Sequence, residues 1–349
     1  MKRCFIFILA AALCLTGCGK KADEATAQIF AMDTVMDLTA YGSQVDAALT
    51  SAEDTIRELE TQLSRTQADS LVSRLNREGA LQGVSGDSLA LMARALEYRD
   101  ATGGAFDITI APVMDAWGFT GDQFRVPEQS ELNELLKHVN SDEIQIQEEP
   151  AHSVTLGEGQ AIDLGGIAKG YTSDLVEQTF RANGIESGKI SLGGNVFVLG
   201  GKPDGSDWRV GIKDPRNESG LAAILSLRDA YAITSGGYER YFEENGKTYH
   251  HIIDPSTGYP ADSGLLSVTV VAADNGPDWA GAGNGAMCDA FSTALFVMGE
   301  EQALDFWRNG GYDFDLVLVT EDGRVVITAG LADRFEEVKD SGYTYETVS

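Results

Sequence analysis

Two residues near the C-terminal end of the chain, Asp289 and Thr293, place a carboxylate and a hydroxyl four positions apart. They lie in a segment, 288–298, whose apolar periodicity predicts a helix, and residues four apart share one helix face. These two groups form a hard-oxygen site that suits Mg²⁺, with Ser292 as a further candidate ligand. A helix-capping Asp and a Thr that only packs would explain the same pattern.

A glycine-rich turn leads into another predicted helix. Asp163 is followed by Gly165, Gly166 and Lys169, and the helical pattern runs over 166–183. Glycine lets the backbone approach a ligand closely, and the free amides at a helix start attract anions. The turn matches neither the dinucleotide fingerprint nor the P-loop. On chemistry alone, an ordinary strand–turn–helix joint explains it equally well.

Two adjacent histidines, His250 and His251, lie in a strand predicted at 248–253. Neighbouring side chains on a strand face opposite ways, so at most one of the two points into a given cleft. Such a pair cannot easily share one zinc ion, and the sequence offers no matching set of cysteines or histidines. A general base near neutral pH is a better use. A surface pair at the end of a strand is the competing explanation.

Two further segments carry groups that suit an aromatic, polar ligand. Phe106 and Asp107 follow a glycine turn after the helix predicted at 87–102, where the ring can stack on a ligand and the carboxylate can accept a hydrogen bond. Met32 belongs to a short Met-Asp-Thr motif that carries little information alone. A core phenylalanine and helix-capping glycines explain these segments at least as well.

The elements that position these groups cluster by type. Helices are predicted at 44–63, 70–76, 87–102, 130–138, 166–183, 288–298 and 301–309. Strands are predicted at 29–42, 190–192, 196–199, 208–212, 223–227, 238–242, 248–253, 265–271, 315–320 and 324–328. Apart from its helix, the polar region 121–160 has the character of a connection. Clustered strands with helices grouped outside them predict an α+β fold rather than a doubly wound parallel sheet.

The amino terminus predicts export. A basic start is followed by an apolar run at 4–13, which is too short for a permanent transmembrane helix, so residues 1–17 are expected to be a signal peptide. Cys18 ends a small-residue box that resembles the bacterial lipobox, which implies lipidation of Cys18. Residues 18–28 would then be a lipidated tether, and 29–349 the folded domain. A secretory signal with an incidental cysteine is the alternative.

Composition restricts the class of partner. The 349 residues carry a formal net charge of −28, which speaks against nucleic acid as a partner because phosphate binding needs a basic face. An anionic ligand would need local positive potential from a metal ion or a helix N-terminus. Beside Cys18, only Cys288 would remain in the mature chain, so an internal disulfide is excluded and stability must come from the core.

Together and in this order, the motifs resemble the FAD:protein FMN transferase family, the ApbE-like flavin transferases. The resemblance covers nearly the whole mature chain, and the series as a whole is highly specific. Its motifs are Met32-Asp33-Thr34, Gly104-Ala105-Phe106-Asp107, Asp163 to Gly170, Ser191 to Asn195, Trp208 to Ile212 with Asp214-Pro215, Thr234-Ser235-Gly236 with Tyr238-Glu239-Arg240, His251 to Pro255 with Thr257-Gly258, and Asp289-Ala290 with Ser292-Thr293.

The resemblance implies two lobes with mostly antiparallel sheets and flanking helices, FAD in the cleft between them, and Mg²⁺ at its diphosphate. The metal ligands would be the Gly166 carbonyl and the side chains of Asp289 and Thr293, with Ser292 as a possible addition. His251 would act as the base. Flavin and adenosine contacts would come from Met32, Ala105, Phe106, Asp107, Asp163, Lys169 and Ile253.

Enzymes of this family cut FAD and join FMN to a Thr or Ser hydroxyl of a target protein, which releases AMP. The implied acceptors are subunits of membrane redox pumps and extracytoplasmic electron carriers. The enzyme itself would be lipid-anchored to a bacterial membrane, facing the periplasm or the cell exterior. Two other functions use the same residues: a Mg²⁺-dependent FAD pyrophosphatase that yields FMN and AMP, and a non-catalytic FAD-binding lipoprotein. Asp289, Thr293 and His251 favour catalysis.

Two departures from the family pattern affect the expected site. Thr66 stands where the family often has a tyrosine, which puts one ring-stacking contact in doubt. The segment 274–286 is longer than usual before the metal-binding helix, and we expect it to be a surface insertion rather than a mobile lid.

Overall fold

The computed structural model describes residues 23–121, 123–276 and 283–349. The signal peptide expected at 1–17 and the lipidation site expected at Cys18 lie outside the described residues. Within the described residues, no helix combines the length and the apolar character that crossing a bilayer requires.

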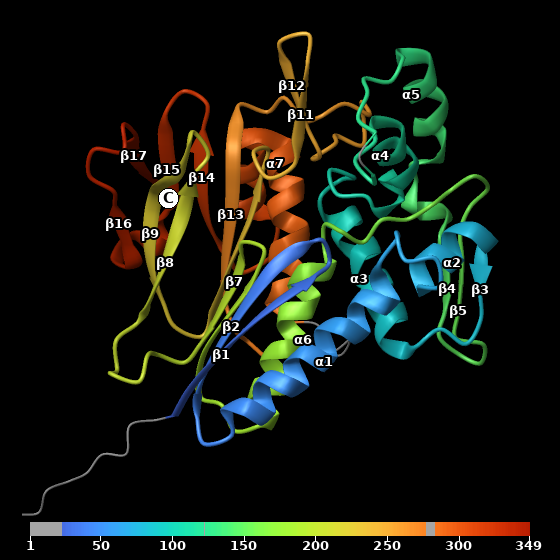
Figure 1. Cartoon of the computed structure of the whole chain (residues 1–349). Helices are drawn as coiled ribbons and strands as arrows, with labels where there is room; N and C mark the ends of the chain where they lie inside the picture. Colours follow the sequence, from blue (N-terminus) through green and yellow to red (C-terminus); the bar gives the residue numbers. More distant parts are fainter. Residues whose placement is uncertain (1–22, 122, 277–282) are drawn as a thin grey trace, which may run out of the picture.

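A nine-stranded sheet forms the centre of the molecule (Figure 1). Neighbouring strands are antiparallel except β15 and β17, which are parallel. This arrangement confirms the expected α+β fold with antiparallel pairing. In spatial order, the strands are β1 (Asp23–Ala31), β2 (Thr34–Gly42), β6 (Ser187–Leu192), β7 (Asn195–Leu199), β10 (Ala230–Gly236), β13 (Leu265–Ala273), β14 (Asp315–Thr320), β15 (Arg324–Thr328) and β17 (Thr344–Val348).

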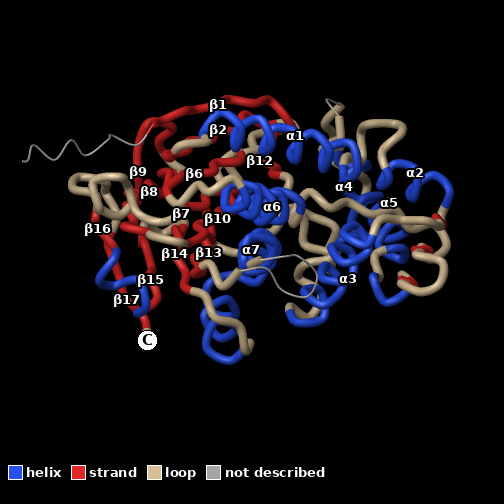
Figure 2. Tube along the Cα trace, turned by 90° about the horizontal axis from the view of Figure 1, so that it is seen from below, coloured by secondary structure: helices blue, strands red, loops and turns tan. Residues whose placement is uncertain are grey.

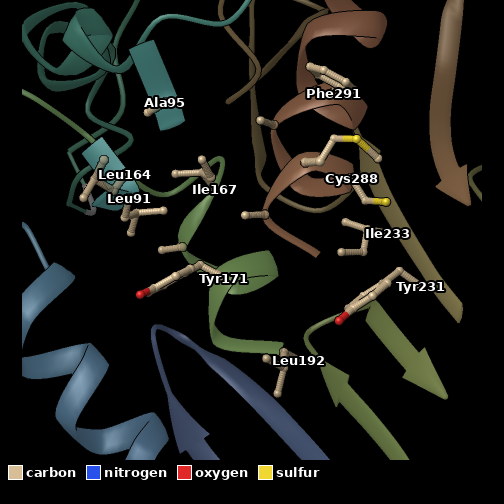
Figure 3. Packing of buried hydrophobic residues seen from close by; sticks show 14 of the residues in the cluster. Leu91, Ala95, Leu164, Ile167, Tyr171, Leu192, Tyr231, Ile233, Cys288 and Phe291 are labelled. Atoms are coloured by element: carbon tan, nitrogen blue, oxygen red, sulfur yellow. The ribbon is translucent and has the colours of Figure 1, made fainter. Parts of the chain in front are cut away.

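Three long helices cover one face of this sheet, as Figure 2 shows. They are α1 (Val45–Leu63), α6 (Ala168–Ala182) and α7 (Asn284–Asn309). The core between sheet and helices is apolar and fully buried; Tyr231 and Ile233 of β10 lie beside Cys288 of α7 in Figure 3. Burial of this apolar surface is the main force that fixes α6 and α7 on the sheet.

The opposite face of the sheet packs against a three-stranded antiparallel sheet and a second apolar cluster. Its strands, in spatial order, are β16 (Phe335–Glu337), β9 (Asn217–Leu227) and β8 (Trp208–Asp214). The short 3₁₀ helix η4 (Ala329–Arg334) joins β15 to β16.

A second lobe, mostly helical, lies beyond α1, α6 and α7 (Figure 2). Its helices are α2 (Leu71–Glu78), α3 (Gly86–Ala101), α4 (Ala111–Trp117) and α5 (Gln129–Leu135), with 3₁₀ turns η1 (Ile108–Ile110), η2 (Leu136–His138) and η3 (Ser141–Glu143). A small sheet is formed by β3 (Ala80–Leu81), β5 (Ser153–Thr155) and β4 (Gln145–Gln147), and a separate hairpin by β11 (Tyr241–Glu244) and β12 (Lys247–His250).

The predicted helices are confirmed within a few residues, with two refinements. Helix α3 begins at Gly86, one residue before the predicted start, and its N-cap is Ser85, whose hydroxyl accepts from the Ser88 amide. The two helices predicted at 288–298 and 301–309 are the two parts of α7, separated at Gly299 by a φ of 79°. Helix α7 begins at Asn284, so the end of the segment 274–286 is helix; its centre, 277–282, lies outside the described residues.

Three features of the large sheet differ from what the sequence led us to expect. The strand expected at 29–42 is a hairpin, because Met32 and Asp33 adopt positive φ and reverse the chain. β1 begins at Asp23, so residues 23–28 of the expected tether belong to the edge strand. Ala25 and Ala27 are partly buried and continue the inward-facing row of Ile29 and Ala31. β10 was not predicted, because its first residues are buried on both faces and its sequence lacks the alternation of a half-buried strand.

Two more expectations about strands need correction. The strands expected at 238–242 and 248–253 form the short hairpin β11–β12, which ends before His251. The region 121–160, expected to be only a connection, contributes β4 and β5 to the small sheet. These strands have three residues each, which is too short for periodicity to detect.

Candidate active site

A cavity of about 710 Å³ opens where one end of the large sheet meets the helical lobe. Its walls come from the β1–β2 turn, the end of α1, the segment after α3, the start of α6, the end of β10 and the segment after β12. The volume is in the usual range for a small-molecule site, about 300–1,000 Å³. The predicted site residues that line it are Met32, Ala105, Phe106, Asp107, Asp163, Gly166, Lys169, His251, Ile253, Asp289 and Thr293.

Asp289 is held by two hydrogen bonds that come from different elements. Its Oδ2 accepts from the amide of Gly170 on α6 at 2.8 Å, and its Oδ1 accepts from the side-chain amide of Asn195 on β7 at 2.9 Å. The residue is 3% exposed, yet it lines the cavity. Each carboxylate oxygen has a second lone pair, so Asp289 is fixed in place and still able to bind a cation.

A chain of three hydroxyls orients Thr293. Ser292 Oγ donates to the Asp289 carbonyl at 2.9 Å, and Ser235 Oγ lies 2.8 Å from Ser292 Oγ and 3.1 Å from Thr293 Oγ1. Because Ser292 gives its hydrogen to the carbonyl, Ser235 must donate to Ser292 and Thr293 to Ser235. The Thr293 hydrogen therefore points along this chain, which leaves oxygen lone pairs for a cavity ligand.

Ser292 itself does not line the cavity. It is completely buried, and its hydroxyl is used by the Asp289 carbonyl and by Ser235. Ser292 immediately precedes Thr293, so its side chain is rotated by about 100° around the helix axis from the side chain of Thr293, which lines the cavity. The structure therefore gives Ser292 a supporting position instead of the expected place among the ligands.

The glycine turn places Gly166 beside Thr293. A methyl group on Gly166 would lie 3.6 Å from Thr293 Oγ1 and 3.1 Å from the Phe106 ring. Asp163 stabilises the turn, since its Oδ1 accepts from the Gly165 amide at 2.7 Å. Its Oδ2 accepts from Arg65 at 3.0 Å. The three expected metal ligands, Gly166, Asp289 and Thr293, thus face one cavity.

Two of the residues predicted to contact FAD, Asp107 and Met32, differ in whether their polar groups are already used by other residues of the protein. Asp107 lines the cavity, but its carboxylate already accepts from Thr109 and from Ser141, and it is buried. We conclude that this carboxylate acts within the protein, where it begins η1. Met32 adopts φ 49° at the tip of the β1–β2 turn, and its amide donates to Glu60 at 2.7 Å.

The two adjacent histidines have different surroundings, as the sequence pattern predicts. His250 points away from the cavity: its Nε2 donates to the Ala261 carbonyl at 3.1 Å, and its ring packs edge-on against Phe296. His251 lines the cavity, and its Nδ1 donates to the Arg240 carbonyl at 3.2 Å. A carbonyl only accepts, so Nε2 of His251 is the unprotonated nitrogen.

Burial and the positive charge of Lys169 lower the pKa of His251 to about 4. The imidazole is therefore neutral at pH 7 and able to accept a proton. An anionic phosphate in the cavity would act in the opposite direction to Lys169 and raise the pKa of His251.

A buried carboxylate joins the start of α7 to α6. Asp174 accepts from the amides of Gly285 and Ala286 at 2.9 and 3.0 Å, and the Tyr231 hydroxyl donates to it as well. Burial raises the pKa of Asp174 to about 7, although these bonds act against that shift. A carboxylate at the N-terminal amides stabilises a helix, so Asp174 fixes where the helix that carries Asp289 begins.

The residues present fit a magnesium ion. In the described part of the chain, no group of three or more His, Cys, Asp or Glu is placed to hold a metal. The expected site has a single carboxylate, with a hydroxyl and a backbone carbonyl as its other protein ligands. Magnesium commonly uses so few protein ligands and completes its shell with water and substrate phosphate. The oriented Thr293 oxygen and the fixed Asp289 carboxylate suit this role.

Three residues that shape the site have no role predicted from the sequence: Asn195, Ser235 and Arg65. Arg65 binds both carboxylate oxygens of Asp115 as well as Asp163. Asn195 and Ser235 stand next to glycines, and these glycine-containing motifs were the only feature of the sequence that pointed to a functional role for the two residues. Their partners are distant in sequence, so the contacts require the tertiary structure.

The chain matches the model of the ApbE family over residues 32–316. It is 32% identical to the FAD:protein FMN transferase of Treponema pallidum over 98% of this chain and 97% of that protein. It is 36% identical to the FAD:protein FMN transferase of Klebsiella pneumoniae over 68% of this chain and 70% of that protein. The fold is similar to the crystal structure of the ApbE protein of Thermotoga maritima, with TM-score 0.78, 30% identity, and coverage of 91% and 97%.

Proposed function

Because this chain belongs to the ApbE family and is an enzyme that transfers FMN from FAD to a protein, we propose that the transfer requires Mg²⁺ and ends on a Thr or Ser hydroxyl of the acceptor. AMP is the second product. The observation that carries the proposal is that Gly166, Asp289 and Thr293 face one cavity, with Asp289 fixed by Gly170 and Asn195.

In the proposed site, Asp289, Thr293 and the Gly166 carbonyl hold the cation, and Lys169 adds positive charge at the diphosphate. The bound cation offsets negative charge on the phosphate oxygens. This arrangement answers the problem raised by the net charge of −28. The walls formed by Met32 and Ile253, together with Ala105, Phe106 and Asp163, bind the flavin and adenosine parts of FAD.

The proposed reaction is a displacement at the phosphorus of the FMN half. The acceptor hydroxyl oxygen forms a bond to this phosphorus, and the bond from phosphorus to the bridging oxygen breaks. That oxygen leaves with AMP. Nε2 of His251 takes the hydroxyl proton, because it faces the cavity as the neutral, unprotonated nitrogen.

We also propose that the enzyme is anchored to a bacterial membrane through lipid on Cys18, facing the periplasm or the cell exterior. The sequence box at residues 15–18 supports this proposal. Incorporation of radiolabelled palmitate into the chain, and its loss in Cys18→Ser, is the test. A chain that is exported but not labelled would contradict lipidation.

The transfer itself is tested with an apo-acceptor, the flavin-bearing domain of a redox-pump subunit purified without flavin. The enzyme is incubated with FAD, MgCl₂ and the apo-acceptor, and the intact mass of the acceptor is measured. We expect a gain equal to one phosphoester-linked FMN, with AMP in solution, and no gain when EDTA is present or when the acceptor Thr is replaced by Val. Free FMN and AMP with an unmodified acceptor would instead identify a pyrophosphatase.

A further inference from the structure

Five large hydrophobic side chains are exposed in the described part of the chain, and all except Leu221 on β9 lie within two residues of, or in ring contact with, residues that line the cavity. Four such residues are Phe30, Val35, Phe124 and Tyr241. Single exposed apolar side chains are ordinary, whereas several of them next to one cavity mark an interaction surface. We call these four side chains the apolar rim.

One side of the apolar rim belongs to the β1–β2 hairpin. Phe30 and Val35 are direct cross-strand partners at its tip, and the Phe30 side chain is 69% exposed. The residues between them, Met32 to Thr34, line the cavity. β1 is an edge strand of the large sheet, so one side of it is unpaired. This hairpin therefore presents an exposed apolar pair next to the turn residues that line the cavity.

The other side of the apolar rim comes from the β11–β12 hairpin and the segment after α4. Tyr241 is 49% exposed and follows Arg240, which lines the cavity. Phe124 stacks on Phe242 with a centroid distance of 5.3 Å and lies edge-on to Phe119 at 5.7 Å. In Figure 1, the β11–β12 hairpin projects from the top of the molecule, well apart from the tip of β1–β2.

We propose that the apolar rim is the docking surface for the acceptor protein, and that it binds apolar side chains on both sides of the hydroxyl residue that receives FMN. This inference rests on the proposed function. With FAD bound in the cavity, the hydroxyl has to approach from outside, and residues next to both hairpins, Met32 to Thr34 and Arg240, line this cavity. The ring centroids of Phe119 and His251 are 6.5 Å apart, and Phe119 also contacts Phe124. Phe124 of the apolar rim is thus one ring away from the proposed base.

The strongly negative net charge of the enzyme favours docking through apolar contacts over docking through opposite charges. The enzyme carries a net charge of −28, so it repels an acidic acceptor at long range. Apolar contact does not depend on the sign of the acceptor's charge, and it does not weaken as salt rises. The affinity for the acceptor is therefore expected to be retained, or to increase, at high salt.

The experiment uses the full-length chain, FAD, MgCl₂ and the apo-acceptor domain described above. Phe30→Ser and Tyr241→Ser each remove one side of the rim. We expect each variant to raise the KM for the acceptor on the order of tenfold, because exposed aromatic anchors contribute most at such surfaces. The affinity for FAD, measured by flavin fluorescence, and kcat at saturating acceptor should stay near the wild-type values.

Matched controls are Gln28→Ser and Glu243→Ser. Each lies two residues from the corresponding rim residue on the same strand, so it shares that residue's face without being apolar. The controls should leave the KM for the acceptor unchanged. Equal KM values for wild type, Phe30→Ser and Tyr241→Ser would overturn the docking proposal while leaving the transferase proposal intact. A wild-type chain that modifies no acceptor would overturn both.

Two other occupants would appear as distinct results. If the rim joins two copies of this chain, sedimentation will show a dimer that Phe30→Ser dissociates, with an unchanged KM for the acceptor. If the rim binds lipid, both variants will lose binding to phosphatidylglycerol vesicles, again with an unchanged KM. Either result would refute docking of the acceptor at this surface.

Discussion

The amide of Gly170 on α6 donates to Oδ2 of Asp289 on α7 at 2.8 Å, so the proposed metal-binding carboxylate is fixed by a backbone group of the neighbouring helix. The two helices meet closely here. A methyl group on Gly170 would lie 2.1 Å from the Gly285 carbonyl oxygen and 2.7 Å from Asp289 Cβ. Only glycine allows this approach.

Gly170→Ala should therefore separate α6 from α7. We expect the free energy of unfolding to fall by about 1–3 kcal/mol or more, as for other overpacked sites, together with a loss of transfer activity. Chemical denaturation and the acceptor-mass assay measure the two effects. Gly86→Ala in α3 is the control, since a methyl group there meets nothing within 4 Å. Wild-type stability in Gly170→Ala would show that the contact between the helices is not tight.

Asp289→Asn keeps the shape of the side chain and removes its negative charge. We expect transfer to fall by at least about 100-fold at every magnesium concentration, because the proposed site has only this carboxylate. The fold should persist, which circular dichroism checks. Undiminished activity at low magnesium would remove Asp289 from the set of ligands.

Ser235→Ala should weaken metal binding without removing a ligand. The Ser235 oxygen accepts the hydrogen of Thr293, so its loss frees that hydrogen to point at the cation. The concentration of MgCl₂ that gives half-maximal transfer should rise severalfold, with near-normal kcat at saturation. Thr234→Ala changes the preceding residue, which bonds to Thr269, and serves as the control. A lower kcat with no change in the magnesium requirement would argue against the hydroxyl chain.

The two histidines provide a matched pair for testing the base. His251→Ala should slow transfer by about 10²- to 10⁴-fold, the usual contribution of general-base catalysis, with little change in FAD affinity. His250→Gln should mainly affect stability, because His250 bonds to Ala261 and packs on Phe296. Single-turnover transfer and FAD fluorescence separate these effects. Equal rates for His251→Ala and wild type would exclude His251 from the mechanism.

The pH profile tests the environment of His251. Its pKa is lowered to about 4, so the base stays neutral down to that pH, and the acid limb of kcat/KM should lie well below 6.5. Lys169→Met removes a positive charge that lowers this pKa, so the acid limb should move to higher pH. Lowering the pH also destabilises the fold, because His251 binds a proton at higher pH in the unfolded chain than in the folded chain. Circular dichroism across the same pH range separates acid unfolding from the change in activity. An acid limb at 6.5 in both proteins would contradict the proposed environment.

Most of the architecture was predictable because long elements carry strong periodicity. Helix α1 shows a clear apolar stripe, and its ends were predicted within one residue. Strand β10 was missed because it is central and buried on both faces, so its sequence has no alternation. The β1–β2 turn was missed because Met32 is an unusual residue at positive φ, and Asp33 is followed by Thr34 and not by the glycine typical of such hairpin turns.

The site was predictable in composition and less so in its supporting contacts. Asp289 and Thr293 are neighbours on one helix, so local spacing was enough to pair them. Their fixation by Asn195 and Ser235 depends on two strands that the sequence does not place beside α7. For the same reason, the use of the Asp107 carboxylate by Ser141 within the protein was not foreseen.

Strand β1 has a consequence for where the reaction occurs. Its nine residues extend about 30 Å from Asp23 to the turn at Met32, at about 3.3 Å per residue. If Cys18 is held in lipid, the five residues to Asp23 reach at most about 18 Å from the bilayer. The cavity would then lie no farther from the membrane than the length of β1 and the length of the five preceding residues together. Acceptors that project a domain away from the lipid surface would meet the enzyme at that height.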